Sequence, residues 1–310
     1  MVNDMKDLIP DRKKDNPSGA EQKAIPAEIH RGRSQWRLAT ERYLRNKPAI
    51  FGLIMLFLLI CSAVFAPLLA TYDPTSIDYG YVRKPPSAEH IFGTDNLGRD
   101  IFSRVLWGGR DSLRVGMVAV LISIVGGVLL GLFSAFAGGF VDNLIQRFVD
   151  LTFAFPTILL LLSIVAALGP NLTTVLIAIG ISGIPGYSRL MRGSVLQALN
   201  TEYVLAARLV GAGNLRLMFR HILPNVLTPI IIYGTLGLGG GIMVTAGLSY
   251  LGLGAQPPAP EWGAMLNEGR TYLQSAPWMS IYPGLAVFLA ILSINLIGDG
   301  LRDALDPKFN

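Results

Sequence analysis

The chain has 310 residues, of which 51% are hydrophobic and only 15% are charged, and its formal net charge is +5. Soluble proteins carry about 25% charged residues, and several apolar runs here reach the roughly 20 residues that cross a hydrocarbon core of about 30 Å. The composition excludes an ordinary soluble domain and predicts an all-α membrane protein with six transmembrane helices.

The N-terminal tail, residues 1–48, is polar and ends in a basic stretch directly before the first apolar run. A charged segment of this length is not typical of a secretory signal peptide. Basic residues beside a span favour the cytoplasmic side, where they can meet anionic lipid headgroups. The first transmembrane helix is predicted at residues 49–70, which contain no charged side chain and include the single cysteine, Cys61.

Residues 71–112 are predicted to form a loop, because they contain turn-forming pairs such as Asp73-Pro74. A cytoplasmic N-terminal tail would place this loop on the periplasmic side. Apolar and charged residues alternate at helical spacing over residues 100–116. This pattern indicates an amphipathic helix at the membrane interface, loosened at Gly108 and Gly109.

Residues 113–303 contain the other five predicted spans, and residues 304–310 follow as a C-terminal tail. The spans are predicted at residues 116–136, 145–168, 172–187, 226–253 and 281–301. Pro156 is expected to bend the third span, and Gly183 with Pro185 to interrupt the fourth. Gly127 and Gly131 have the spacing that permits close packing of two membrane helices.

The fifth predicted span is rich in glycine, at Gly237, Gly239, Gly240 and Gly241. Small residues with exposed backbone polarity suit the wall of a narrow aqueous pore. The same residues also suit tight contact between helices. Both interpretations stay open at this point.

Two acidic residues, Asp150 and Asp299, fall within predicted spans near their cytoplasmic ends. Charges at such positions are much less costly than central ones, so a paired structural role is expected for both. Helix spacing would allow Asp299 to contact Arg302. A proton relay would need an acid near the middle of a span, and the sequence has none there.

The longest polar interruption in the second half of the chain lies at residues 200–225. It is predicted to form two short helices, at residues 202–210 and 215–223, with a bend at Gly211 and Gly213 and a stop at Pro224. Small residues would let another backbone approach, and basic residues surround them. The pattern predicts a docking surface for a partner protein, carried by Ala206, Ala207, Arg208, Gly211, Arg216, Arg220 and His221.

Most of the 26 basic residues lie in the N-terminal tail and in the connections that six spans would place on the same side. The positive-inside rule then predicts that both termini and residues 200–225 are cytoplasmic. This placement accounts for the net charge without nucleic acid. Two helices around a glycine bend also occur in DNA-binding motifs, but a loop held between two spans offers too few phosphate contacts.

No glycine precedes a lysine in the chain, so a phosphate-binding loop of the GxxxxGK[ST] type is absent. The three histidines and one cysteine are far apart in the sequence, and no metal site is expected. No grouping of nucleophile, base and orienting residue stands out. The sequence therefore does not predict an enzyme, and it needs no cofactor of its own.

Residues 200–225 also carry a family resemblance. Ala206-Ala207, Gly211 and Leu223-Pro224 resemble the EAA loop of bacterial ABC importer permeases, although Leu205 and His221 depart from that pattern. Four longer strings are similar to the dipeptide/oligopeptide subfamily, which also handles glutathione and nickel, and the first loop resembles its C-type subunit. The strings are YVLAARLVGAGNLRLMFRHILPN, FGTDNLGRDIFSRVLWGGRDSLRVG, GLGAQPPAPEWGAML and NLIGDGLRDALDPKF.

The resemblance implies a multi-pass subunit of the bacterial inner membrane, with a cytoplasmic coupling loop at residues 189–225. A second homologous permease would complete the pore, two ATPase subunits would bind ATP and Mg, and a periplasmic or lipid-anchored binding protein would deliver the peptide. Leu223 and Pro224 join the seven residues above as predicted ATPase contacts. Glu261 and Trp262 are predicted at the outer mouth, facing the binding protein, or as part of a structural outer loop.

A self-contained secondary carrier is the competing interpretation, because Pro156, Pro185 and the glycine run are compatible with broken helices around a central site. The energy source separates the two, since a carrier depends on an ion gradient and an importer on ATP. The sequence leaves the substrate open among dipeptides, longer peptides, glutathione and nickel chelates.

Overall fold

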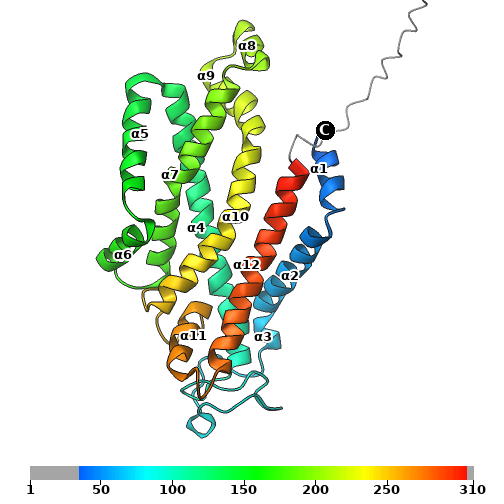
Figure 1. Ribbon diagram of the computed structural model, residues 1–310, viewed down its shortest axis with the longest axis vertical. Helices are drawn as coiled ribbons and strands as arrows, with labels where there is room; N and C mark the ends of the chain where they lie inside the picture. Colours follow the sequence, from blue (N-terminus) through cyan, green and yellow to red (C-terminus); the bar gives the residue numbers. More distant parts are fainter. Residues whose placement is uncertain (1–34, 306–310) are drawn as a thin grey trace, which may run out of the picture.

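The computed structural model describes residues 35–305, which form helices and one isolated bridge between Thr94 and Asp100. Figure 1 shows the long helices side by side, with connecting segments at both ends. The all-α class is confirmed. Five helical spans are long and apolar enough to cross a membrane: α2 (Lys47–Val64), α4 (Ile101–Ala137), α7 (Leu172–Ala198), α9 to α10 (Asn214–Tyr250) and α12 (Trp278–Leu305). The tail at residues 1–34 and residues 306–310 lie outside the described residues.

The first predicted span is a helix in two pieces. α2 begins after Asn46, whose side chain accepts a hydrogen bond from the Ala49 backbone at 3.1 Å, and ends at Val64. α3 (Ala66–Leu69) follows after Phe65. Arg110 donates to the carbonyl of Val64 at 2.7 Å, which satisfies one of the unpaired acceptors at the end of α2.

The segment at residues 100–116 is the first part of the long helix α4, which continues unbroken to Ala137. A helix was predicted here and is present, but the expected loosening at Gly108 and Gly109 was wrong. A Cβ at Gly108 would collide with the carbonyl oxygen of Pro260, and one at Gly109 would lie 3.1 Å from the Trp262 ring. The two glycines make room for a neighbouring segment, and this packing supports the helix where glycine alone would weaken it.

The third predicted span is divided into α5 (Gly139–Ala154) and α6 (Thr157–Leu168), which meet at an angle of 92°. Pro156 lies at the junction as the residue that precedes α6. In Figure 1, α6 runs across the bundle while α5 runs along it. The bend was expected at this proline, but the sequence did not indicate a right angle. Counted as one span, the pair brings the total to six.

α7 continues through Gly183 and Pro185, where an interruption was predicted, and ends eleven residues beyond Tyr187, at Ala198. Its long contact with α4 supports the helix through the proline. The Ser123 hydroxyl of α4 donates to the Gly180 carbonyl at 2.8 Å.

Gly127 and Gly131 of α4 lie against α7, as their spacing predicted. A Cβ at Gly131 would lie 2.9 Å from the Met191 Cβ and would collide with the Ser188 carbonyl oxygen. The absence of side chains at these positions therefore sets how closely the two helices approach.

Gly131→Leu is expected to separate α4 from α7 and to lower the thermal stability of the purified subunit, because a well-packed contact has no room for a new side chain. The expected loss is about 1–3 kcal/mol. Gly247→Ala is the matched control, since a Cβ there meets nothing within 4 Å and alanine favours a helix. Thermal unfolding in detergent measures both; equal melting temperatures would contradict the close-contact interpretation.

Residues 200–225 form α8 (Glu202–Leu209), α9 (Asn214–Arg216), a π-helical turn at Leu217–Ile222 and the start of α10 (Leu223–Tyr250). The first short helix is confirmed. The second was expected to stop at Pro224, but it continues into α10.

The π-helical turn explains how the helix passes the proline. The Leu223 N–H donates to the carbonyl of Met218, five residues back. Pro224 has no N–H to donate, and a wider turn rearranges the hydrogen bonds around the missing donor. The predicted stop at Pro224 was therefore wrong, because the wider turn before the proline lets the helix continue past the missing donor.

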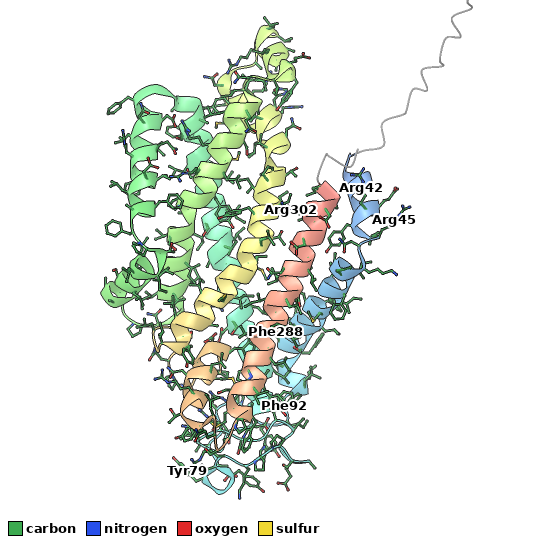
Figure 2. All side chains as sticks on the ribbon, in the orientation of Figure 1. Arg42, Arg45, Tyr79, Phe92, Phe288 and Arg302 are labelled. Atoms are coloured by element: carbon green, nitrogen blue, oxygen red, sulfur yellow. The ribbon has the colours of Figure 1, made fainter. Side chains whose placement is uncertain are left out.

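The two ends of the bundle differ. α8, α9 and α1 (Gln35–Tyr43) lie at one end, and α11 (Trp262–Gly269) lies at the other with the folded segment between α3 and α4 (Figure 1). Figure 2 shows Arg42, Arg45 and Arg302 at the first end and Tyr79 and Phe92 at the second. Two short 3₁₀ helices, Tyr79–Tyr81 and Arg270–Tyr272, complete the described elements.

Candidate functional site

The polar segment between α7 and α10 encloses an open hollow of about 360 Å³, which we call the coupling hollow. Four of the predicted partner-contacting residues line it, and two further residues were not predicted. The lining residues are Ala206, Ala207, Val210, Ala212, Arg216 and His221. Since alanine methyl groups form much of its wall, the hollow can accept a side chain or helix end from another protein.

The other predicted residues surround this hollow or support it. Gly211 has φ +86°, so it forms the turn between α8 and α9 in a backbone conformation that favours glycine. Arg208 and Arg220 are exposed. Leu223 is half-buried and packs against the core, while Pro224 is exposed at the start of α10.

Large apolar side chains are exposed beside the coupling hollow. Leu209 and Val210 are each 89% exposed, and Leu215 is 72% exposed. Exposed apolar residues gathered on one surface are typical of a protein contact. Sequence reasoning missed them, although two apolar residues directly before a glycine turn are a readable signal.

A second cavity, of about 200 Å³, lies between α4, α6, α7 and α10, and we call it the inner cavity. Three of the four predicted pore glycines line it: Gly237, Gly240 and Gly241. Gly239 does not, because it faces α12, where a Cβ would lie 3.1 Å from the Asn295 side-chain oxygen. Gly239 therefore makes a close helix contact, and the pore-lining role of the other three glycines stays a prediction.

The lining of the inner cavity is uncharged. Its polar groups are hydroxyls from four helices, on Ser123, Thr157, Ser182, Tyr187 and Tyr233. The Tyr187 and Tyr233 rings meet edge to face, with centroids 5.0 Å apart. A Cβ at Gly237 would lie 2.5 Å from the Tyr187 hydroxyl, so the absence of a side chain at position 237 makes room for Tyr187.

Asp150 is paired, as predicted, with Arg189 of α7 across a distance of 2.6 Å. Both side chains are about half exposed, at 57% and 52%. Arg189 also lies over the Phe153 ring, 4.3 Å from its centroid. Asp299 is exposed, and the expected contact with Arg302 is not among the ion pairs of the described residues.

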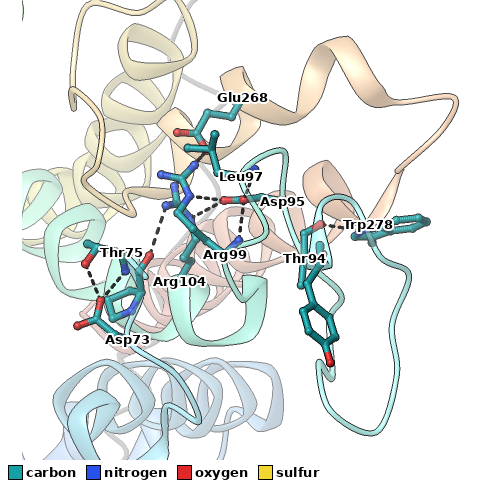
Figure 3. Close-up of polar contacts among 11 residues, drawn as sticks. Asp73, Thr75, Thr94, Asp95, Leu97, Arg99, Arg104, Glu268 and Trp278 are labelled. Carbon is teal, nitrogen blue, oxygen red and sulfur yellow. Dashed lines mark hydrogen bonds and ion pairs between the residues drawn. The ribbon is translucent and has the colours of Figure 1, made fainter. Parts of the chain in front are cut away.

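A buried cluster of charges ties the segment before α4 to α11 (Figure 3). Arg99 Nε lies 2.6 Å from Asp95, and its guanidinium also lies 2.7 Å from Glu268. Arg104 Nη2 lies 3.1 Å from the same Glu268 oxygen. The two arginines are 2% and 0% exposed, so each positive charge depends on these carboxylates. Sequence reasoning placed Arg104 at a membrane surface and missed the cluster.

Glu261 and Trp262 are buried, at 0% and 2% exposure, so the prediction that they face a binding protein was wrong. Glu261 caps α11 by accepting a hydrogen bond from the Ala264 N–H at 2.9 Å, and it also accepts one from the Ser112 hydroxyl at 3.0 Å. The Trp262 indole donates to the Val105 carbonyl at 2.9 Å. Both side chains hold α11 against α4, as a structural outer loop requires.

Two protein families match the chain. Residues 127–310 match the family described as binding-protein-dependent transport system inner membrane component. Residues 34–86 match the family described as the N-terminal TM domain of oligopeptide transport permease C.

Curated relatives align over most of their length. The chain is 47% identical to the dipeptide transport system permease protein DppC of Alkalihalophilus pseudofirmus, over 91% of this chain and 93% of the relative. It is 46% identical to the di/tripeptide permease DppC of Pseudomonas aeruginosa, over 86% and 90%. It is 45% identical to the glutathione permease GsiD of Pectobacterium atrosepticum, over 89% and 92%.

Solved structures of the inward-facing MetNI methionine ABC transporter share the fold. In one crystal form the TM-score is 0.54 with 18% identity, over 66% of this chain and 96% of that chain. A second form gives a TM-score of 0.51 with 20% identity. The chain therefore belongs to the family of inner membrane components of binding-protein-dependent transport systems, as a transmembrane permease subunit.

Proposed function

We propose that the chain forms half of the translocation pore of an ATP-driven importer of short peptides. The coupling hollow is the observation that carries this proposal, because small residues, exposed leucines and arginines meet there at one end of the bundle. The relatives named as dipeptide and di/tripeptide permeases support a short peptide as the substrate. A relative named as a glutathione permease makes glutathione, itself a modified tripeptide, the second candidate.

The proposed assembly has a second homologous permease, two ATPase subunits and a periplasmic or lipid-anchored binding protein. ATP and Mg would be bound by the ATPases, since this chain has no glycine followed by lysine. The coupling hollow would face the cytoplasm together with α1 and the end of α12, in agreement with the many basic residues of these segments. ATPase closure would move the coupling loop and open the pore outward.

The energy source tests this function. Vesicles that contain the complex and its binding protein are expected to accumulate a labelled dipeptide when ATP is supplied inside, and to continue after an uncoupler has removed the proton gradient. Depletion of ATP is expected to stop uptake. Uptake that survives ATP depletion and ends with the uncoupler would identify a secondary carrier instead.

A further inference from the structure

The Arg189–Asp150 ion pair lies inside two helices of the bundle and not at their ends, since α5 begins eleven residues before Asp150 and α7 ends nine residues after Arg189. About half of each side chain is nevertheless exposed. A charged side chain that faces lipid is costly, and intramembrane charges usually face water or a protein interior. The exposed side of this pair is therefore expected to face an aqueous path. Its position, in the second half of α7, is far from the folded segment and α11 at the outer end.

Arg189 lies on the same face of α7 as a residue that lines the inner cavity. Ser182, Gly186 and Arg189 follow one another at helical spacing of three to four residues, so they lie on one face of α7. Ser182 lines the cavity. A Cβ at Gly186 would lie 3.6 Å from the Tyr233 hydroxyl, which places the cavity-lining Tyr233 beside the next position of the same face.

We propose that this face of α7, with Asp150 and Tyr233, is the substrate-contacting surface of the pore, and that Arg189 attracts the acidic side chains of a peptide while Asp150 attracts the basic ones. The inference rests on the proposed function and adds to it the residues that touch the substrate. The uncharged hydroxyls of the inner cavity can exchange hydrogen bonds with a peptide backbone of any side-chain composition. The ion pair adds one cation and one anion at the end of this surface.

The first test asks whether the face is in contact with water. Cys61 is the only cysteine of the chain, so Cys61→Ser gives a background without thiols in this subunit. In the complete complex, Tyr233→Cys is expected to react with a hydrophilic, charged thiol reagent. Phe288→Cys is the matched control, because Phe288 and Tyr233 are similarly exposed, at 57% and 50%. Phe288 lies on a different helix, α12 (Figure 2). Equal lack of reaction at both cysteines would overturn the aqueous-face assignment.

The second test asks whether the ion pair meets the substrate. Arg189→Gln is expected to slow uptake of Ala-Glu about fivefold more than uptake of Ala-Lys, because an acidic peptide loses its attraction to the guanidinium. Asp150→Asn is expected to have the opposite preference. Each rate is divided by the amount of peptide held by the binding protein. An equal loss for both peptides would mean that the pair is only structural, and would overturn the inference.

Uptake by the parent complex distinguishes a failure of the proposed function from a failure of the substrate-contacting surface. If it accumulates neither dipeptide with ATP, the proposed function fails. If it accumulates both, and Tyr233→Cys is unreactive or the two peptides respond alike, the proposed function stands and this inference fails.

Discussion

Ala206→Trp is expected to reduce ATP-driven uptake by about tenfold or more while the subunit still inserts in the membrane. Ala206 lines the coupling hollow and is exposed, so a tryptophan there fills the hollow without disturbing the core. Overpacking a protein contact costs about 1–3 kcal/mol, and about 1.4 kcal/mol corresponds to a tenfold change in association. Uptake and co-purification with the ATPase measure the effect together.

Ala137→Trp is the matched control for this prediction. Ala137 is also an exposed alanine, but it ends α4 and does not line the coupling hollow. It is expected to keep ATPase association and uptake close to those of the parent. If Ala206→Trp also keeps both, the coupling hollow is not the site of ATPase docking.

Glu268→Gln is expected to destabilise the subunit by about 3–5 kcal/mol, the usual effect of removing one partner from a buried ion pair. Its carboxylate lies 2.7 Å from Arg99 and 3.1 Å from Arg104, so the change leaves two buried positive charges with Asp95 alone. The amide keeps the shape of the side chain and removes only the negative charge. Thermal unfolding of the purified complex in detergent provides the measurement.

Glu89→Gln is the control, because it makes the same change at the same end of the bundle on an exposed side chain. Glu89 accepts a hydrogen bond from the Tyr81 hydroxyl at 3.1 Å, and this bond raises the pKa of Tyr81. Its loss is expected to leave the melting temperature close to that of the parent, because water replaces an exposed partner. Equal melting temperatures for the two variants would show that the cluster does not hold the outer loop.

The helices and their order follow from composition and periodicity, and the exposed arginines and alanines of residues 202–216 were readable because they are close in sequence. Contacts between distant segments were not readable. Gly108 and Gly109 look like a weak point until Pro260 and Trp262 are placed against them. The sequence shows that a side chain is missing, but not which neighbour occupies the space.

Contacts between distant segments also explain why the roles of Arg104 and Trp262 were not predicted. Arg104 looks like a charge on an amphipathic helix, because its partner Glu268 lies 164 residues further along the chain. Trp262 resembles an interfacial anchor, since an isolated tryptophan beside prolines has the same appearance in sequence whether it is exposed or buried. The partner of Asp150 was missed for a related reason: Asp150 and Arg189 belong to different helices, and only their packing brings the charges together.

The continuous helix from Asn214 to Tyr250 has a mechanical consequence. At about 1.5 Å per residue it is roughly 55 Å long, well beyond a hydrocarbon core of about 30 Å. One end forms a wall of the coupling hollow and its middle forms a wall of the inner cavity, at Arg216 and Gly237. A displacement of the helix at the coupling hollow would therefore reach the inner cavity through one continuous helix, with no loop between the two sites. The π-helical turn at Leu217–Ile222 interrupts the regular hydrogen-bond pattern of that helix, so its stiffness would affect how much of each ATPase movement arrives at the cavity.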